Sequence, residues 1–134
     1  MADDIRYLSF DEVVAIHDAE SPAPLSSPNL LDSAVNRPKQ SAFGDDAYPT
    51  IHLKAAALME SLTMNQPFTD GNKRTSVLAT IAFYNLNGYI FDAPDWDLYG
   101  LADAMSIADH DSRPSVEQVA TVLESWVTEV PDPV

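Results

Sequence analysis

Apolar residues recur at three- and four-residue spacing along most of the chain, which is the pattern of amphipathic helices. The pattern is most regular downstream of Gly71, at Val77, Leu78, Ile81, Ala82 and Leu86. Asn87-Gly88 then supplies a C-terminal stop. We therefore expect a helix that begins near Asn72 and ends at Asn87-Gly88.

A second apolar stretch runs from about Thr50 to Met64 and has little purely polar face. Such a stretch is typical of a helix at the centre of a bundle. Its run Ala55-Ala56-Ala57 allows another helix to approach closely. The two stretches flank a short polar loop, so this loop is expected to lie between two rigid central helices.

Capping and turn residues mark the outer elements. Ser9 and Glu12 form a capping box for a first helix that runs to about Glu20. A second helix is expected to start at Pro28 and to end at Arg37-Pro38. Ser115-Val116-Glu117-Gln118 is another capping box, at the start of the last helix.

Three aromatic residues outside the central stretches, Phe43, Trp96 and Tyr99, are expected to be buried. Phe43 lies in a connection and is a candidate anchor to the core. Asp95 is expected to cap a helix whose apolar set is Trp96, Leu98, Tyr99, Leu101, Ala102, Met105 and Ile107. This set is more aromatic than a core needs, so exposure to a partner is the alternative to burial. Together the patterns predict an all-α fold, a compact bundle of about six helices, in a single domain over residues 1–134.

Composition narrows the class of protein. The chain has 134 residues, a net charge of −14 and no cysteine, which suits one domain without disulfides or thiolate chemistry. No apolar run opens the chain or reaches membrane-spanning length, so we expect no signal peptide, no membrane and a cytoplasmic location. The negative charge opposes direct binding to nucleic-acid backbones. It suits a basic partner surface, or it reflects no more than an acidic proteome.

The loop Asn65–Thr75 is the densest collection of groups that could hold a phosphate. A helix that begins near Asn72 leaves its first N–H groups unpaired, and such an end attracts anions. Gly71 lets the backbone approach a ligand, while Lys73 and Arg74 add charge. Asp70 would hold Mg²⁺, because Mg²⁺ prefers carboxylate and phosphate oxygens.

A purely structural interpretation of the same residues remains open. Asp70 could be an N-cap, Gly71 a turn residue, and Lys73 and Arg74 a solvated first turn. Cations are unfavourable at that end of a helix, which favours a bound anion. Phe68 is expected to point inward and to attach the loop to the core.

The loop resembles the signature of the Fic/Doc family, His-x-Phe-x-(Asp or Glu)-(Gly or Ala)-Asn-x-Arg at the start of a helix. The residues that match in register are Phe68, Asp70, Gly71, Asn72 and Arg74. Lys73 and Thr75 favour the Doc branch. The adenylylating Fic branch has Gly where Lys73 lies and a further Arg where Val77 lies. Similarity extends to Tyr7-Leu8, Ile16-His17-Asp18, Leu30–Val35 with Arg37-Pro38, Tyr48-Pro49-Thr50 and Lys54–Leu58.

One position departs from the signature, because the family's histidine falls on Gln66. In the family that histidine is the general base, and a glutamine amide cannot accept a proton near neutral pH. Loss of a general base typically costs about 10²–10⁴-fold in rate. The three histidines, His17, His52 and His110, lie outside the loop. His17 is expected to be a packed or surface helical residue, with a contact near the site as the alternative. Gln66 therefore indicates a weakened or inactive member, or a change that lets a host tolerate a toxic protein.

The resemblance implies a Doc toxin, which transfers the γ-phosphate of ATP to a threonine of elongation factor Tu and stops translation. It implies ATP and Mg²⁺ as cofactors and a Phd-like antitoxin, whose disordered tail folds onto the toxin, as a partner. The implied catalytic positions are Gln66, Asp70, Lys73 and Arg74, with Asp70 as the metal ligand. The implied nucleotide-binding positions are Phe68, Gly71, Asn72, Lys73 and Arg74.

Two other functions stay open. The first is adenylyl transfer, against which Lys73 and Val77 both count. The second is a non-catalytic member that only binds nucleotide or a partner, which Gln66 would suit.

Overall fold

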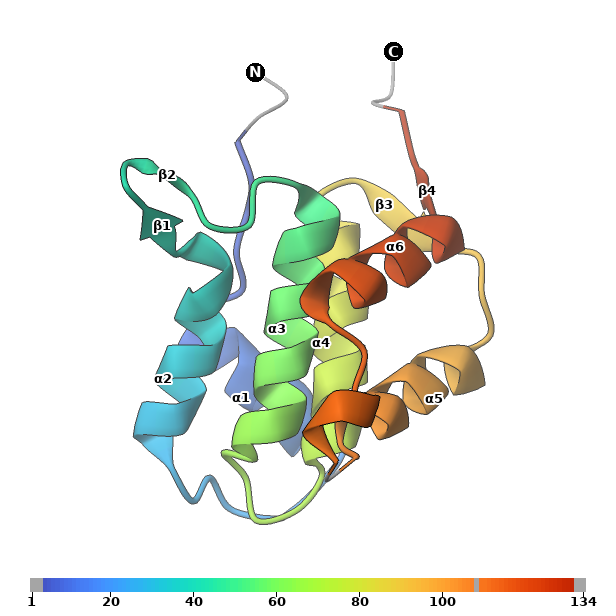
Figure 1. Cartoon of the computed structure of the whole chain (residues 1–134). Coiled ribbons are helices and arrows are strands. Elements are labelled where there is room, and N and C mark those ends of the chain that lie inside the picture. Colours follow the sequence, from blue (N-terminus) through green and yellow to red (C-terminus); the bar gives the residue numbers. More distant parts are fainter. Residues whose placement is uncertain (1–3, 108, 132–134) are drawn as a thin grey trace.

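The computed structural model describes residues 4–107 and 109–131, and Figure 1 shows it as a ribbon. Within these residues the α-helices are α1 (Phe10–Asp18), α2 (Pro28–Asn36), α3 (Ile51–Asn65), α4 (Asn72–Leu86), α5 (Asp95–Met105) and α6 (Val116–Trp126). Two short 3₁₀ helices are η1 (Arg37–Lys39) and η2 (His110–Ser112). The strands β1 (Ser41–Ala42) and β2 (Asp45–Asp46) form one antiparallel pair, and β3 (Tyr89–Phe91) and β4 (Val127–Glu129) form another. The prediction of an all-α bundle of about six helices is confirmed.

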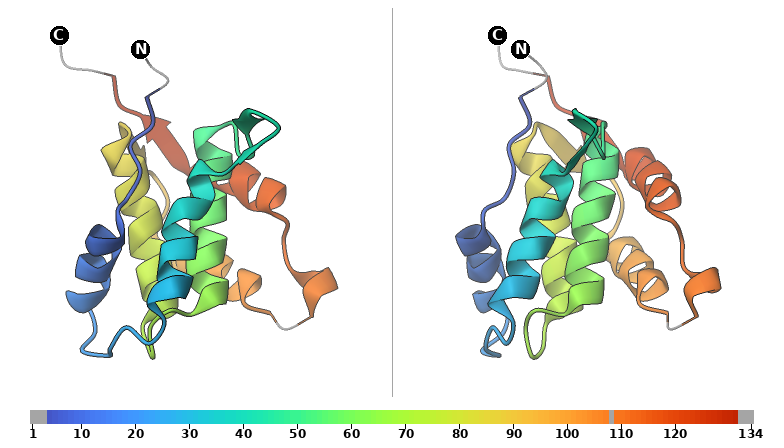
Figure 2. Two further views of the ribbon diagram at one scale, coloured as in Figure 1. Left: turned by 90° about the vertical axis from the view of Figure 1, so that its left-hand side faces the viewer. Right: turned by 60° about the vertical axis from the view of Figure 1, so that its left-hand side comes forward.

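The helices α3 and α4 run antiparallel through the middle of the bundle (Figures 1 and 2). The helices α1 and α2 lie on one side of this pair, and α5 and α6 lie on the other (Figure 2). The run Ala55-Ala56-Ala57 is completely buried, because small side chains let neighbouring helices pack close to α3. Val77 and Ala79 of α4 are buried as well. The central position predicted for both helices is thus confirmed.

Most of the predicted helix ends are confirmed, because their signals are local hydrogen bonds. The capping boxes Ser9–Glu12 and Ser115–Gln118 are both formed. Thr50 caps α3 by accepting a hydrogen bond from the Leu53 N–H. The helix α1 ends at Asp18, two residues before the predicted end.

Predictions at four residues of the outer elements are wrong, namely Asp95, Trp96, Ile107 and Phe43. Ile107 lies beyond the end of α5 and is 43% exposed. Asp95 is the first residue of α5 rather than its cap, which is Pro94. Trp96 is 74% exposed, because only one stripe of α5 faces the bundle, and Leu98, Ala102 and Met105 occupy it. The aromatic surface of this helix is therefore exposed at its start, as the alternative interpretation held.

Phe43 does not anchor its connection to the core, because it is fully exposed at the tip of the β1–β2 hairpin. Ala42 pairs with Asp45, so Phe43-Gly44 is a two-residue turn. Both turn residues have positive φ, 55° and 85°, which is the conformation such turns require. This backbone directs the Phe43 side chain into solvent.

Among the described residues, no helix combines the length and the apolar character needed to cross a lipid bilayer.

Candidate functional site

The loop between α3 and α4 lies at one end of the central pair (Figure 1). Its two ends both have left-handed backbone. Gln66 is the C-cap of α3 with φ 48° and ψ 59°, and Gly71 is the N-cap of α4 with φ 83°. Left-handed backbone is uncommon for residues other than glycine, so the chain reverses sharply at Gln66. The residue at this position therefore lies at the end of a rigid helix.

The loop is held in shape by one side chain inside it. The Asn72 side-chain oxygen accepts a hydrogen bond from the Phe68 N–H at 2.9 Å, and its NH₂ group donates to the Phe68 C=O at 2.7 Å. The Phe68 side chain is buried, 2% exposed, so its predicted inward position is confirmed. Asn72 thus uses both polar atoms of its side chain to brace the loop.

The connection between α1 and α2 runs beside the loop and supports it from outside. Leu25 and Phe68 form an isolated antiparallel β-bridge. The N–H and hydroxyl of Ser26 both donate to the Pro67 C=O at 2.9 Å. The Thr69 N–H donates to the Pro24 C=O at 3.1 Å. A second segment, distant in sequence, thus fixes the first half of the loop.

His17 of α1 lies behind the loop and is completely buried. Its Nε2 is 2.8 Å from the carbonyl oxygen of Asp70. Its ring stacks on the Phe68 ring, with centroids 3.7 Å apart and planes 5° from parallel. His17 is therefore a packed helical residue, as expected from the sequence, and it also contacts the loop of the site, which was the alternative expectation.

A cavity of about 540 Å³ opens at the loop. Its lining residues are Thr63, Gln66, Thr69, Asp70, Gly71, Asn72, Lys73, Arg74 and Ser106. The structure thus brings every site residue predicted from the sequence to this cavity except Phe68, which is buried. A ligand in the cavity would meet both ends of the loop at once.

The N-terminus of α4 faces this cavity. The first intrahelical hydrogen bond runs from the Thr75 N–H to the Gly71 C=O at 2.9 Å, so the N–H groups of Asn72, Lys73 and Arg74 precede it. Gly71 has no side chain that could cap them, and Asp70 is not the N-cap. This arrangement supplies unpaired donors and the positive end of a helix dipole. The interpretation of Asp70 as a plain N-cap is therefore wrong.

The two cations of the loop are each paired with a carboxylate from another element. The Lys73 ammonium forms an ion pair with Asp103 of α5. The Arg74 guanidinium lies 3.2 Å from Glu20, which follows α1, and 5.9 Å from the centre of the Tyr99 ring. The cations are thus not a simple solvated first turn. An anion in the cavity would compete with these two carboxylates.

A buried pair of hydroxyls ties α3 to the first turn of α4. The Thr63 hydroxyl donates to the Ser76 oxygen at 2.9 Å, and the Ser76 hydroxyl donates to the Lys73 C=O at 2.7 Å. Thr63 and Ser76 are 3% and 0% exposed. These two consecutive hydrogen bonds fix the position of the Lys73 backbone relative to α3.

The contributions of Thr63, Glu20, Asp103 and Ser106 to the site were not predicted, whereas a contact near the site was the alternative interpretation of His17. Glu20 and Asp103 lie 54 and 30 residues from their partners in the sequence. No motif spacing connects such pairs. A histidine near the end of an apolar helix was the one weak signal.

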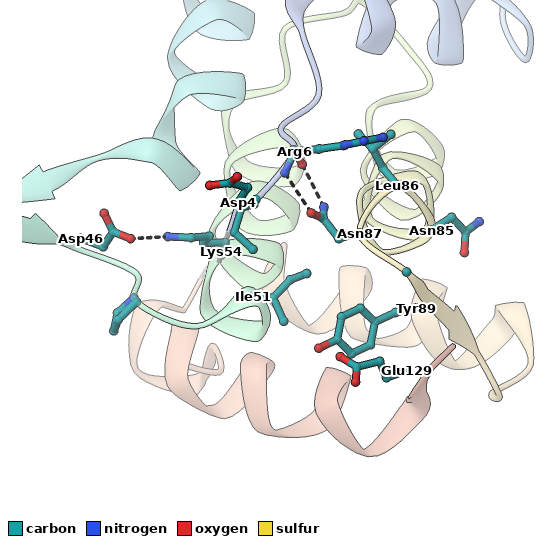
Figure 3. Close-up of a pocket in the computed structure, with 13 residues that line it drawn as sticks. Asp4, Arg6, Asp46, Ile51, Lys54, Asn85, Leu86, Asn87, Tyr89 and Glu129 are labelled. Carbon is teal, nitrogen blue, oxygen red and sulfur yellow. Dashed lines mark hydrogen bonds and ion pairs between the residues drawn. The ribbon is translucent and has the colours of Figure 1, made fainter. Parts of the chain in front are cut away.

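A larger cavity of about 750 Å³ lies at the opposite end of the central pair (Figure 3). There the buried Lys54 ammonium donates to the Asp46 carboxylate at 3.1 Å, and the Asn87 amide bonds to the Arg6 backbone (Figure 3). This cavity meets both the C-terminus of α4 and the N-terminus of α3, so the two helix dipoles oppose each other there, and its lining includes three carboxylates, Asp4, Asp46 and Glu129. The cavity at the loop is therefore the better candidate for a phosphate site.

Within the described residues no group of three or more His, Cys, Asp or Glu side chains could hold a metal ion. Of the carboxylates in the part of the chain that the structure describes, Asp70 is the one that lines the loop cavity. A single carboxylate suits Mg²⁺ that takes its other ligands from phosphate and water, so the donor set fits Mg²⁺ only together with a phosphate ligand.

Two comparisons with known proteins each match part of the chain. The model of the Fic/DOC family matches residues 7–84, which include α1 to α4 and the loop. The chain is 46% identical over 77 residues to a protein of Mycolicibacterium smegmatis (strain ATCC 700084 / mc(2)155) named "Toxin Doc". This match covers 58% of the present chain and 58% of that relative.

Proposed function

The chain belongs to the Fic/DOC family, and from this premise we propose that it is a Doc-like toxin. Its proposed reaction transfers the γ-phosphate of ATP to a threonine of elongation factor Tu and so blocks translation. The observation that carries the proposal is the cavity in which the N-terminus of α4, Lys73 and Arg74 meet. Donors and cations in this arrangement suit a polyphosphate.

Each residue of the loop has a role in this proposal. The N–H groups at the start of α4 bind phosphate oxygens. Lys73 and Arg74 stabilise the negative charge on the phosphoryl group while it is transferred. Asp70 holds Mg²⁺, which neutralises phosphate charge when it is bound. Asn72 keeps the loop in shape through its two hydrogen bonds to Phe68.

Gln66 limits the proposed reaction. The threonine oxygen attacks the γ-phosphorus, the bond from this phosphorus to the leaving ADP oxygen breaks, and the hydroxyl loses its proton, which goes to solvent water where no general base takes it. Gln66 lines the cavity, and the sequence resemblance places it where the family has its general base. Its amide cannot take that proton. We therefore propose that the chain as it stands is a weakened transferase.

The test is restoration of the base with Gln66→His. Purified elongation factor Tu is incubated with ATP and Mg²⁺, and the modified threonine is identified by mass spectrometry. We expect a phosphoryl addition whose rate rises by about 10²–10⁴-fold in Gln66→His. Gln66→Asn, which keeps an amide, is the matched control and should stay at the level of the parent chain.

The outcomes separate the proposal from its rivals. An adenylyl addition would support the adenylylating alternative, against which Lys73 and Val77 count. Equal, negligible transfer by the parent chain and Gln66→His would contradict the proposal and favour a non-catalytic member of the family. The non-catalytic alternative is considered because Gln66 cannot act as a general base.

The name of the relative also suggests a partner. We propose that a Phd-like antitoxin binds this chain and that its disordered tail folds on binding. Joint expression with the product of a small neighbouring gene, followed by co-purification, tests this pairing. If the chain elutes alone under those conditions, the proposed pairing is wrong.

A further inference from the structure

We propose that His17 is a positioning residue that sets where Asp70 and Gly71 lie in the candidate site. The consequence for a nucleotide rests on the proposed function, whereas the contact itself does not. His17 belongs to α1, and Asp70 lies 53 residues further along the chain. One side chain of an outer helix thus holds the second half of the loop, in addition to the contacts that Asn72 and the α1–α2 connection make.

The first argument is a hydrogen bond with a defined direction. The Asp70 carbonyl can only accept, so His17 Nε2, at 2.8 Å, carries the proton that it donates. The ring is completely buried, so its Nε2–H would have no water to replace this acceptor. A buried donor without an acceptor is costly, so the peptide after Asp70 is held at His17.

The second argument is that the same ring fills the space behind the loop. It stacks on Phe68 at 3.7 Å. A Cβ on Gly71 would lie 3.2 Å from Nε2 and 3.3 Å from Cδ2 of His17. The ring therefore contacts the loop at Phe68, Asp70 and Gly71, which leaves the loop little freedom to move toward α1.

The third argument is that the ring itself is held in orientation. Its Nδ1 lies 3.0 Å from the Asp18 carboxylate, on the opposite edge from Nε2. A completely buried ring that donates from Nε2 to the Asp70 carbonyl and stacks on Phe68 across one face has little freedom to turn. His17 can therefore transmit a defined position from α1 to the loop.

These contacts orient the groups that face the cavity. The Asp70 carbonyl points to His17, while Asp70 also lines the cavity with Gly71 and Asn72. A shift of the Asp70–Gly71 peptide would move the carboxylate and the first N–H groups of α4 together. His17 thus acts on the nucleotide through Asp70 and Gly71, without contact of its own.

Two substitutions separate the functions of the ring. His17→Gln retains a side-chain N–H donor of similar reach and loses the stacked ring. His17→Phe retains a ring to stack on Phe68 and loses the donor. His52→Phe is the matched control, because His52 also bonds through one nitrogen, to the Tyr84 hydroxyl at 2.8 Å, and lies at the other end of α3.

The first measurement is the amide resonance of Gly71 in ¹⁵N-labelled protein without nucleotide, because this amide shares a peptide group with the Asp70 carbonyl. We expect His17→Phe to shift it, His17→Gln to leave it close to the parent position, and His52→Phe to leave it unchanged. The second measurement is the affinity for ATP with Mg²⁺ by calorimetry. We expect about tenfold weaker binding in His17→Phe and near-parent binding in His17→Gln.

An unshifted Gly71 resonance in His17→Phe would overturn the proposal. If His17→Phe does not fold, His17→Gln decides through the ¹³C resonance of the Asp70 carbonyl, which reports on the hydrogen bond of this carbonyl: a resonance close to the parent position supports positioning by the N–H donor, and one displaced to that of a carbonyl without this bond refutes it. If the parent chain binds no ATP, the proposed function fails, and the Gly71 resonance still decides the role of His17. The two failures are therefore distinguishable.

Discussion

The pairing of both loop cations with carboxylates leads to a quantitative prediction for the double variant Glu20→Gln/Asp103→Asn. The four side chains are half-exposed or nearly so, with Lys73 at 45% and Arg74 at 56%. Exposed ion pairs of this kind contribute about 0.2–1 kcal/mol each. A phosphate that takes both cations has to overcome about 0.4–2 kcal/mol in total, twice that range. Removing the carboxylates should therefore tighten ATP binding by about 2- to 30-fold.

Calorimetric titration with ATP and Mg²⁺ at low ionic strength measures this gain directly. The matched control is Asp11→Asn/Asp45→Asn, which removes the same number of negative charges from the start of α1 and from the β1–β2 hairpin. This control corrects for the general effect of a smaller net charge. The gain should shrink as salt is added, because exposed charges are screened.

Unchanged or weaker binding in the double variant would refute the reasoning. Weaker binding would mean that Glu20 and Asp103 hold the cations in the orientation that the phosphates need. Unchanged binding, with parent affinity measurable, would mean that Lys73 and Arg74 do not reach the nucleotide. In that case only the N–H groups of α4 would remain as phosphate ligands.

Three further predictions concern stability. Phe43→Asn should raise the free energy of unfolding by about 0.5–1 kcal/mol, because Asn tolerates positive φ and the exposed Phe43 side chain contributes no packing; a lower melting temperature would contradict this. Ser76→Ala should cost about 1–3 kcal/mol in urea unfolding, since it leaves the buried Thr63 hydroxyl without its acceptor, and a neutral result would mean that Thr63 finds another partner. Burial lowers the pKa of His52, opposed by the nearby Glu124, so the unfolded chain takes up that proton more readily. Protonation of His52 therefore favours the unfolded chain, so the stability that neutral His52 allows is complete above the ordinary histidine pKa and is lost as pH falls through the lowered pKa. We expect a smaller loss of stability at acid pH in His52→Gln than in the parent chain, and an equal loss would count against this reasoning.

Much of the fold could be predicted because its signals are local. The capping residues Ser9, Thr50 and Ser115 bond to N–H groups three residues further along. The start of α4 follows in the same way from Gly71 and the apolar spacing beyond it. The all-α architecture then results from packing the apolar faces of these helices together.

Exposure of single aromatic residues could not be predicted in this way. Phe43 and Trp96 are apolar, yet both lie in solvent. Their positions depend on the turn of a hairpin and on which stripe of α5 meets the bundle. Neither is a property of the neighbouring sequence.

The sequence by itself determined which groups the loop offers, from Gln66 to Arg74, and that they precede a helix, because adjacent residues share a backbone. Only the tertiary structure decided what surrounds them. It pairs Lys73 with Asp103 and Arg74 with Glu20, and it sets His17 against the Asp70 carbonyl. The physical reason is that these partners come from other helices, and their distances depend on how the whole bundle packs.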